Sequence, residues 1–213
     1  GYWLVHDYSD NLIYVIDISN PDAPVKFSQW SVPNMVNGGT GNMMIEGTLM
    51  YLPCGENFTL RIYDLSDLTA VTQVGSVSTA PEQHFGNPVK IGSYVYIGTS
   101  IWLGASFLRV IDVSNPASPT VVGSLAPTGA VMGMNGKLFA FGPGPTVHAF
   151  SLADPLVPVV EASSTVPVPA PSTSLDLLFV AWHSGWVGNY LIGLTHGSAS
   201  EYHGIRAMDF TVN

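Results

Sequence analysis

Four of the six histidines fall in polar segments where their side chains could hold a metal, namely His6, His84, His196 and His203. Imidazole nitrogens suit zinc, copper and iron. No pair of these histidines has a tight spacing such as His-x-x-x-His. A metal site therefore requires the fold to bring His6 and His84 beside His196 or His203. Asp7 and Glu56 indicate a second chemistry, since paired carboxylates supply the acid and base of glycoside hydrolysis. These residues define one hypothesis, a metal- or carboxylate-dependent hydrolase.

Aromatic residues occur in the same segments and indicate carbohydrate binding instead: Tyr8, Phe85, Trp102 and Tyr202. Flat rings stack on the apolar C–H faces of sugars, and neighbouring polar groups hydrogen-bond to the sugar hydroxyls. The polar residues beside these rings are Asp7, Glu56, Asn57 and Glu201. A third interpretation is that all of them are ordinary loop residues spread apart on the surface, because unpatterned histidines and carboxylates are a weak signal of function.

The length, composition and charge of the chain limit its classes of function. It has 213 residues, of which 46% are apolar and 10% charged, and a formal net charge of -9 at pH 7. A surface this acidic repels nucleic-acid phosphates and anionic lipid. No apolar run reaches the roughly 18 residues of a membrane-spanning helix, and the single Cys54 excludes an intramolecular disulfide. We therefore expect one domain with its own apolar core and with neither nucleic acid nor a membrane as its partner.

Two short sequence patterns recur five times and indicate tandem repeats. The first is a glycine followed by alternating apolar residues, at Gly1, Gly47, Gly92, Gly136 and Gly188. The second follows after a loop and in four copies ends in Asp: Ile13–Asp17, Leu60–Asp64, Leu108–Asp112, Val147–Ser151 and Ile205–Asp209. The glycines are 46, 45, 44 and 52 residues apart, which is too regular for chance.

Each repeat divides into four short strands bounded by Gly, Pro, Asn or Ser. In the second repeat we expect these strands at 42–46, 48–53, 60–65 and 71–76. Four-stranded units of about 40–50 residues in tandem are typical of a β-propeller, in which each sheet is a blade buried between its neighbours. We predict an all-β fold, one propeller domain of five blades of four antiparallel strands, at 1–41, 42–87, 88–129, 130–174 and 175–213.

The two terminal blades are expected to be incomplete. The first repeat lacks its innermost strand and the last stops after its third, so eighteen strands are expected where five full blades need twenty. The chain also begins at Gly1 instead of a methionine, which indicates a processed chain or a piece of a longer one. A larger ring is therefore the alternative to five blades.

The turns after the third strands share a sequence pattern whose complete form is Asp-x-Ser-Asn-Pro. We expect Asp17 and Asp112 to accept hydrogen bonds from N–H groups of the turn, and the proline to end strand pairing. In three repeats an arginine precedes the Asp by three residues: Arg61, Arg109 and Arg206. Because three is an odd number, its side chain should lie on the opposite face of the sheet, partly exposed at the blade edge.

The sequence LRVIDVSNPASPTVVGSL at 108–125, with its counterparts in the other repeats, resembles the LVIVD-repeat family of β-propeller proteins. The resemblance extends over nearly the whole chain, is strongest in the third repeat and departs in the fourth, where Ser151 replaces the Asp. It implies a propeller, often on a secreted or cell-surface protein. It implies no single activity and brings no catalytic residues.

The order of strands also predicts which loops share a face. In an up-and-down blade, the loops between second and third strands lie on the same face as the crossovers between blades. We call this the variable-loop face, because these segments are long and varied, as binding segments on a rigid scaffold usually are. We predict a non-enzymatic recognition module without a cofactor that binds a glycan or a protein through this face. The acidic, Ser/Thr-rich surface suits an extracellular, cell-envelope or virion-surface setting within a larger assembly.

Overall fold

The computed structural model consists of β-strands joined by turns and loops. It describes residues 1–7, 10–33, 43–54, 58–100, 106–125, 131–134, 136–141, 146–165, 185–187, 190–196 and 202–209. Within these ranges all regular secondary structure is β-strand, so the all-β prediction is confirmed. Among the same residues there is no helix long and apolar enough to cross a membrane.

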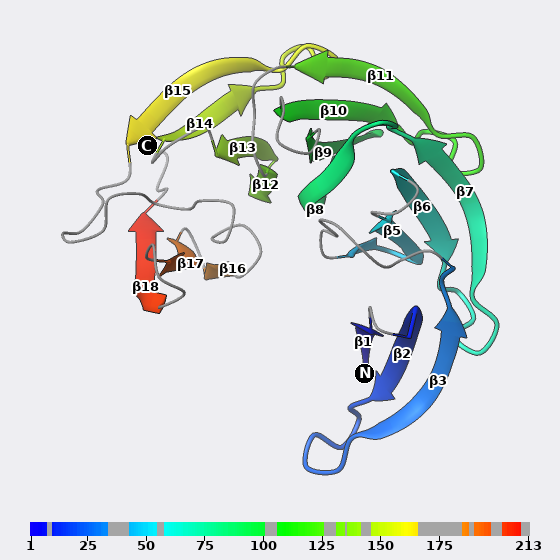
Figure 1. Ribbon diagram of the computed structural model, residues 1–213. Helices are drawn as coiled ribbons and strands as arrows, with labels where there is room; N and C mark the ends of the chain where they lie inside the picture. The colour runs from blue at the N-terminus through cyan, green and yellow to red at the C-terminus, as the bar shows by residue number, and fades with distance from the viewer. Residues whose placement is uncertain are drawn as a thin grey trace.

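Eighteen strands form five antiparallel sheets that follow one another along the chain (Figure 1). The first sheet contains β1 (Tyr2–Asp7), β2 (Leu12–Asp17) and β3 (Val25–Ser31). The second contains β4 (Met44–Glu46), β5 (Leu49–Cys54), β6 (Thr59–Asp64) and β7 (Thr72–Ser78). The third contains β8 (Gln83–Ile91), β9 (Tyr94–Ser100), β10 (Ser106–Asp112) and β11 (Thr120–Leu125). The fourth contains β12 (Val131–Met134), β13 (Lys137–Phe141), β14 (Thr146–Ser151) and β15 (Val159–Thr165), and the fifth β16 (Gly185–Val187), β17 (Tyr190–His196) and β18 (Tyr202–Asp209).

Within every sheet, strands that are consecutive in sequence are paired, so each sheet is an up-and-down meander. The second, third and fourth sheets have four strands and the two terminal sheets have three, as the repeats predict. Figure 1 shows the sheets side by side in an arc, with β3, β7, β11 and β15 along its outside and an opening between the first and fifth sheets. The repeats are therefore separate antiparallel sheets arranged around a common centre.

Successive sheets pack face to face through apolar side chains that alternate along the strands. We call the side of a sheet that faces the following sheet its leading side, and the opposite side its trailing side. The cluster between the first and second sheets contains Ile13, Val32, Met50, Leu52, Cys54 and Tyr63. The next cluster contains Tyr51, Leu60, Ile62, Val95, Ile97, Ile111 and Val113, and the third contains Val89, Tyr96, Leu108, Val110, Val131, Leu138, Ala140 and Phe150. Each fully buried side chain of this size stabilises the fold by about 1.5–3 kcal/mol.

The turns after the third strands have the predicted hydrogen bonds. The carboxylate of Asp17 accepts the backbone N–H of Ser19 at 2.8 Å, and that of Asp112 accepts the N–H of Ser114 at 2.8 Å. Hydrogen bonds from the serine hydroxyl and N–H hold the pKa of Asp17 below its usual value, and those from Ser114 do the same for Asp112. The structural role predicted for both residues is confirmed.

These turns also pack against the outer strand of the preceding sheet, at positions with small residues. A Cβ added to Gly75 of β7 would lie 2.0 Å from the carbonyl oxygen of Pro116, in the turn of the third sheet. A Cβ on Gly123 of β11 would lie 2.7 Å from the carbonyl oxygen of Leu156, in the turn of the fourth sheet. In the first sheet, the hydroxyl of Ser28 donates a hydrogen bond to a carbonyl of the next turn, that of Leu68. The recurring small residue therefore makes room for the turn of the following sheet.

The glycine pattern is displaced by one residue in the first repeat. The carbonyl of Gly1 accepts the N–H of Ile18, whereas the equivalent bonds in the next two sheets are to Thr48 and Ser93. Gly1 thus corresponds to the residue after the turn glycine, and not to Gly47 or Gly92 as the sequence comparison suggests. The sequence pattern does not reveal this displacement, because the alternation of apolar residues continues on both sides of the turn.

Candidate functional site

The strand directions place most of the predicted site residues at one end of the sheets. Second strands end there and third strands begin there, and the crossovers arrive at the same end. Of the candidate ligand-binding residues, Tyr8, Glu56, Asn57, Trp102 and Glu201 lie outside the described residues. Their roles therefore stay predictions.

Five further candidates lie in strands whose backbone is described. His84 and Phe85 are near the start of β8, His196 ends β17, and Tyr202 and His203 begin β18. All five are thus at the strand ends that form the variable-loop face. This placement comes from the backbone alone. The strand order allows these histidines to meet at one end of the sheets, and their convergence on a metal stays a hypothesis.

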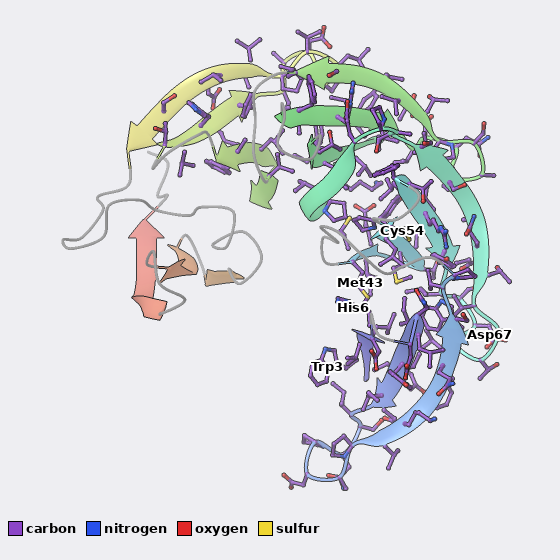
Figure 2. The ribbon with its side chains drawn as sticks, viewed as in Figure 1. Trp3, His6, Met43, Cys54 and Asp67 are labelled. Atoms are coloured by element: carbon purple, nitrogen blue, oxygen red, sulfur yellow. The ribbon has the colours of Figure 1, made fainter. Side chains whose placement is uncertain are left out.

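The imidazole of His6 lies between the first and second sheets. His6 is opposite Ile13 in the β1–β2 register, so both side chains project from the leading side of the first sheet. Figure 2 shows His6 at this junction, in the same region as Met43, which packs against the cluster shared by the two sheets. Burial lowers the pKa of His6 below 6.5, against an opposing effect of the neighbouring Asp7 carboxylate. The ring is therefore neutral at pH 7, with the protonation state that a metal ligand needs.

Asp7 projects from the other side of β1, because successive residues of a strand alternate between its faces. It ends β1 and is half-buried. Among the residues that the structure describes, no three His, Cys, Asp or Glu side chains are close enough to hold a metal ion. This finding does not apply to His84, His196 and His203, because only the backbone of these residues is described.

Cys54 closes β5 at the same end of the sheets, but it belongs to the core. Its side chain is fully buried in the cluster between the first and second sheets. Burial raises the pKa of the thiol to about 11, with a smaller opposing effect from Arg61. A thiol with this pKa is protonated at pH 7 and is a poor nucleophile or metal ligand.

Glu82, directly before β8, lies near the variable-loop face, but its side chain is interior. Only 5% of its side chain is exposed. One carboxylate oxygen accepts the Nε–H of Arg109 at 2.7 Å and the hydroxyl of Thr99 at 2.6 Å, and the other accepts a second guanidinium N–H of Arg109. With both oxygens engaged, this carboxylate is held as an acceptor and is not free to act as an acid or base.

We call the arginines that precede the repeat Asp by three residues the arginine column, and in the second and third sheets they anchor the segment that enters the sheet, a role that the sequence does not reveal. Arg109 reaches the segment that enters its own sheet through Glu82, and Arg61 reaches the equivalent segment by donating to the carbonyl of Pro33 at 2.7 Å. Both side chains lie on the trailing side of their sheets, opposite to Asp64 and Asp112, as the odd spacing predicts. Both are partly exposed, as expected, and each also makes a hydrogen bond that the repeat pattern does not reveal. A carboxylate 27 residues before the arginine is the sequence signal that could have revealed the Arg109 contact, whereas the Arg61 contact is to a backbone carbonyl and has no such signal.

In the fourth sheet the same column holds a histidine. His148 is opposite Ala140 in register, as Arg109 is opposite Ile97. One of its ring nitrogens, Nδ1, lies 2.8 Å from the hydroxyl of Ser163 on the adjacent β15. The fourth sheet therefore uses this position for a bond within the sheet, and the variation agrees with its weaker repeat sequence.

A search of protein families matches the LVIVD repeat at residues 2–30 and 89–126. The chain carries LVIVD repeats. These two ranges correspond to the first and third sheets, and the second of them contains Arg109 and Asp112. No curated protein matches this LVIVD-repeat chain in sequence.

Solved structures share the fold at low sequence identity. A functionally unknown protein from Desulfotomaculum acetoxidans DSM 771 is similar with a TM-score of 0.61 and 10% identity, over 95% of this chain and 70% of that one. A 6-phosphogluconolactonase candidate from Bacteroides fragilis NCTC 9343 is similar with a TM-score of 0.60 and 12% identity, over 98% and 63% of the two chains. The Bacteroides ovatus protein Xyloglucan PUL GH43B gives a TM-score of 0.51 and 15% identity, over 83% and 41%. The chain therefore shares its overall fold with these solved structures, and it spans less than two thirds of the last two.

Proposed function

We propose that the LVIVD-repeat chain is a non-enzymatic recognition module, a propeller whose blades are the five sheets, and that its variable-loop face binds a glycan or a protein. The observation that carries the proposal is the anchoring of the crossovers. Glu82, directly before β8, is tied to Arg109 and Thr99, and Pro33 is tied to Arg61. Segments that leave such fixed points present their side chains at a small conformational cost on binding.

A glycan is the first ligand class to test. Phe85 follows Glu82 by three residues and lies in β8, and the sequence predicts that Trp102 and Tyr202 belong to the same face. Aromatic rings with nearby carboxylate and amide groups match the apolar faces and hydroxyls of sugars. The acidic net charge argues against anionic glycans and favours neutral ones.

The test is a screen of the 213-residue chain against an array of neutral glycans, followed by calorimetry on any glycan that binds. We expect Trp102→Ala to weaken binding by about tenfold or more, the effect of losing a central aromatic contact. Trp3→Ala is the matched control and should leave the affinity unchanged, because Trp3 is the second residue of β1 and lies toward the opposite end of the sheets. Equal effects of the two substitutions would contradict the proposal.

The same screen separates the other hypotheses. Cleavage of an oligosaccharide, abolished by Asp7→Asn or Glu56→Gln, would establish the carboxylate-dependent hydrolase. Cleavage that depends on added zinc and on His84 would establish the metal-dependent one. A lack of any glycan signal would leave a protein partner as the ligand. An extracellular, envelope or virion-surface location within a larger assembly accords with each kind of recognition, and it rests on composition.

A further inference from the structure

The trailing side of the first sheet has the residues of a sheet–sheet interface, but no sheet among the described residues packs on it. Trp3, opposite Ile16, is the equivalent of Met50, Val95 and Leu138, which are opposite Tyr63, Ile111 and Phe150. Those three equivalents are 0% exposed, each within the cluster shared with the preceding sheet, whereas Trp3 is 61% exposed. Figure 2 shows the Trp3 side chain directed away from the second sheet. A large apolar side chain at this position is therefore built for burial and is left open to solvent.

The turn of the first sheet gives a second, independent indication. Pro119 of the third sheet is buried against the preceding sheet, with its Cδ 3.2 Å from a Cβ built on Gly75, and Pro158 of the fourth is also buried. The equivalent Pro24 is exposed, and so is Pro21, the counterpart of Pro116. The first sheet thus presents both halves of the interface that the third and fourth sheets use on their predecessors.

The arrangement of the sheets indicates what covers this surface. The arc is open beside the first sheet in Figure 1. Two solved structures match 95% and 98% of this chain, but this chain accounts for only 70% and 63% of theirs. Those structures therefore continue beyond the part that the five sheets match, as a ring with a further sheet would.

We propose that the trailing side of the first sheet is the docking surface for one further blade-type sheet, distinct from the five described. This sheet covers Trp3, Val5 and Ile16 with an apolar leading side. Its outer strand has a small residue, equivalent to Gly75, against which the turn at Pro21 packs. The inference rests on the fold and is independent of the recognition role proposed above. A second copy of the chain is disfavoured as the occupant because both copies carry a charge of -9.

The third sheet suggests the test. Its trailing side presents Val95, Ile97 and Ile111 where the first sheet presents Trp3, Val5 and Ile16, and it packs on the second sheet. Since Gly1 is equivalent to Ser93, an added copy of residues 43–92 placed directly before Gly1 continues the chain in register. The graft supplies a blade-type sheet and an inner strand like β8 for the open edge of β1. The matched control is the same graft with Gly75→Val in the added copy only, which blocks the seat of the turn.

Trp3 itself reports the result, through acrylamide quenching of the fluorescence that Trp3→Phe removes. We expect acrylamide to quench Trp3 readily in the unaltered monomeric chain and at least about twofold less in the grafted chain. In the Gly75→Val control the quenching should return to that of the unaltered chain. The graft should also melt at a higher temperature than this control. Equal accessibility in graft and control, or a graft that melts no higher than the control, would overturn the proposal. Protection of Trp3 in the unaltered chain would also overturn it. If that chain is a monomer, the fifth sheet would be the occupant. If sedimentation shows a dimer, the occupant would be a second copy.

Discussion

The guanidinium of Arg109 holds the carboxylate of Glu82, which lies 27 residues earlier in the chain, through two hydrogen bonds in a nearly buried setting. Thr99 of the strand between them donates a third. The three residues join the crossover, β9 and β10 of one sheet. A repeat motif thereby fixes the entry of the chain into its own sheet, next to the face proposed to bind a ligand.

Breaking this pair should destabilise the protein strongly. Arg109→Met leaves the Glu82 carboxylate buried without its cation, and we expect the free energy of unfolding to fall by about 3–5 kcal/mol in urea. The double substitution Arg109→Met with Glu82→Gln should recover part of this loss. Lys137→Met is the matched control: its ion pair with Glu161 is about 40% exposed on both sides and should contribute about 0–1 kcal/mol. Similar losses for the two single variants would show that burial of the Arg109 pair has no special weight.

The thiol of Cys54 should be inert in the folded protein. Its pKa is raised to about 11 and its side chain is fully buried, so we expect no reaction with Ellman's reagent at pH 8 and a full stoichiometric reaction after unfolding in guanidinium. A surface cysteine introduced as Ser66→Cys, in an exposed turn, serves as the reactive control. Rapid labelling of Cys54 under native conditions would mean that the first and second sheets separate readily.

The turn aspartates should titrate below the usual value for this side chain. Hydrogen bonds from Ser114 lower the pKa of Asp112 below 3.8 in the folded state. Its contribution to stability is therefore complete above the unfolded-state pKa and is lost as the pH falls through the lower folded-state pKa. Carboxyl chemical shifts measured by NMR should place the Asp112 midpoint below 3.8, and Ser114→Ala should move it upward. A midpoint at or above 3.8 would contradict the turn geometry.

Gly75 should tolerate no side chain. A Cβ there would be 2.0 Å from the carbonyl oxygen of Pro116, so Gly75→Ala must displace the turn of the third sheet and should cost about 1–3 kcal/mol or more. Gly47→Ala is the comparison: nothing lies within 4 Å of its added Cβ, but its φ of +60° makes about 1 kcal/mol of strain. Chemical denaturation of both variants ranks them. A milder effect at Gly75 than at Gly47 would show that the turn does not pack there.

Much of the fold could be predicted because its signals are local. Alternating apolar residues and turn residues gave β6 and β7 within two residues of their bounds, and the Asp-x-Ser-Asn-Pro turns form the hydrogen bonds expected of them. The burial of Glu82 and Cys54 could not be predicted, because sequence position locates a strand end but does not report burial. The shared strand ends of His84, His196 and Tyr202 follow from strand order alone.

The sequence by itself determined the number of repeats, the all-β class and the face on which the varied loops emerge, because these depend on residue periodicity and chain direction. Only the tertiary structure decided that Arg109 meets Glu82, that Gly1 occupies the register of Ser93 and that the Trp3 side chain is exposed. The reason is physical: each of these facts depends on which sheet packs against which, and such contacts join residues far apart in the chain through packing that no local pattern encodes.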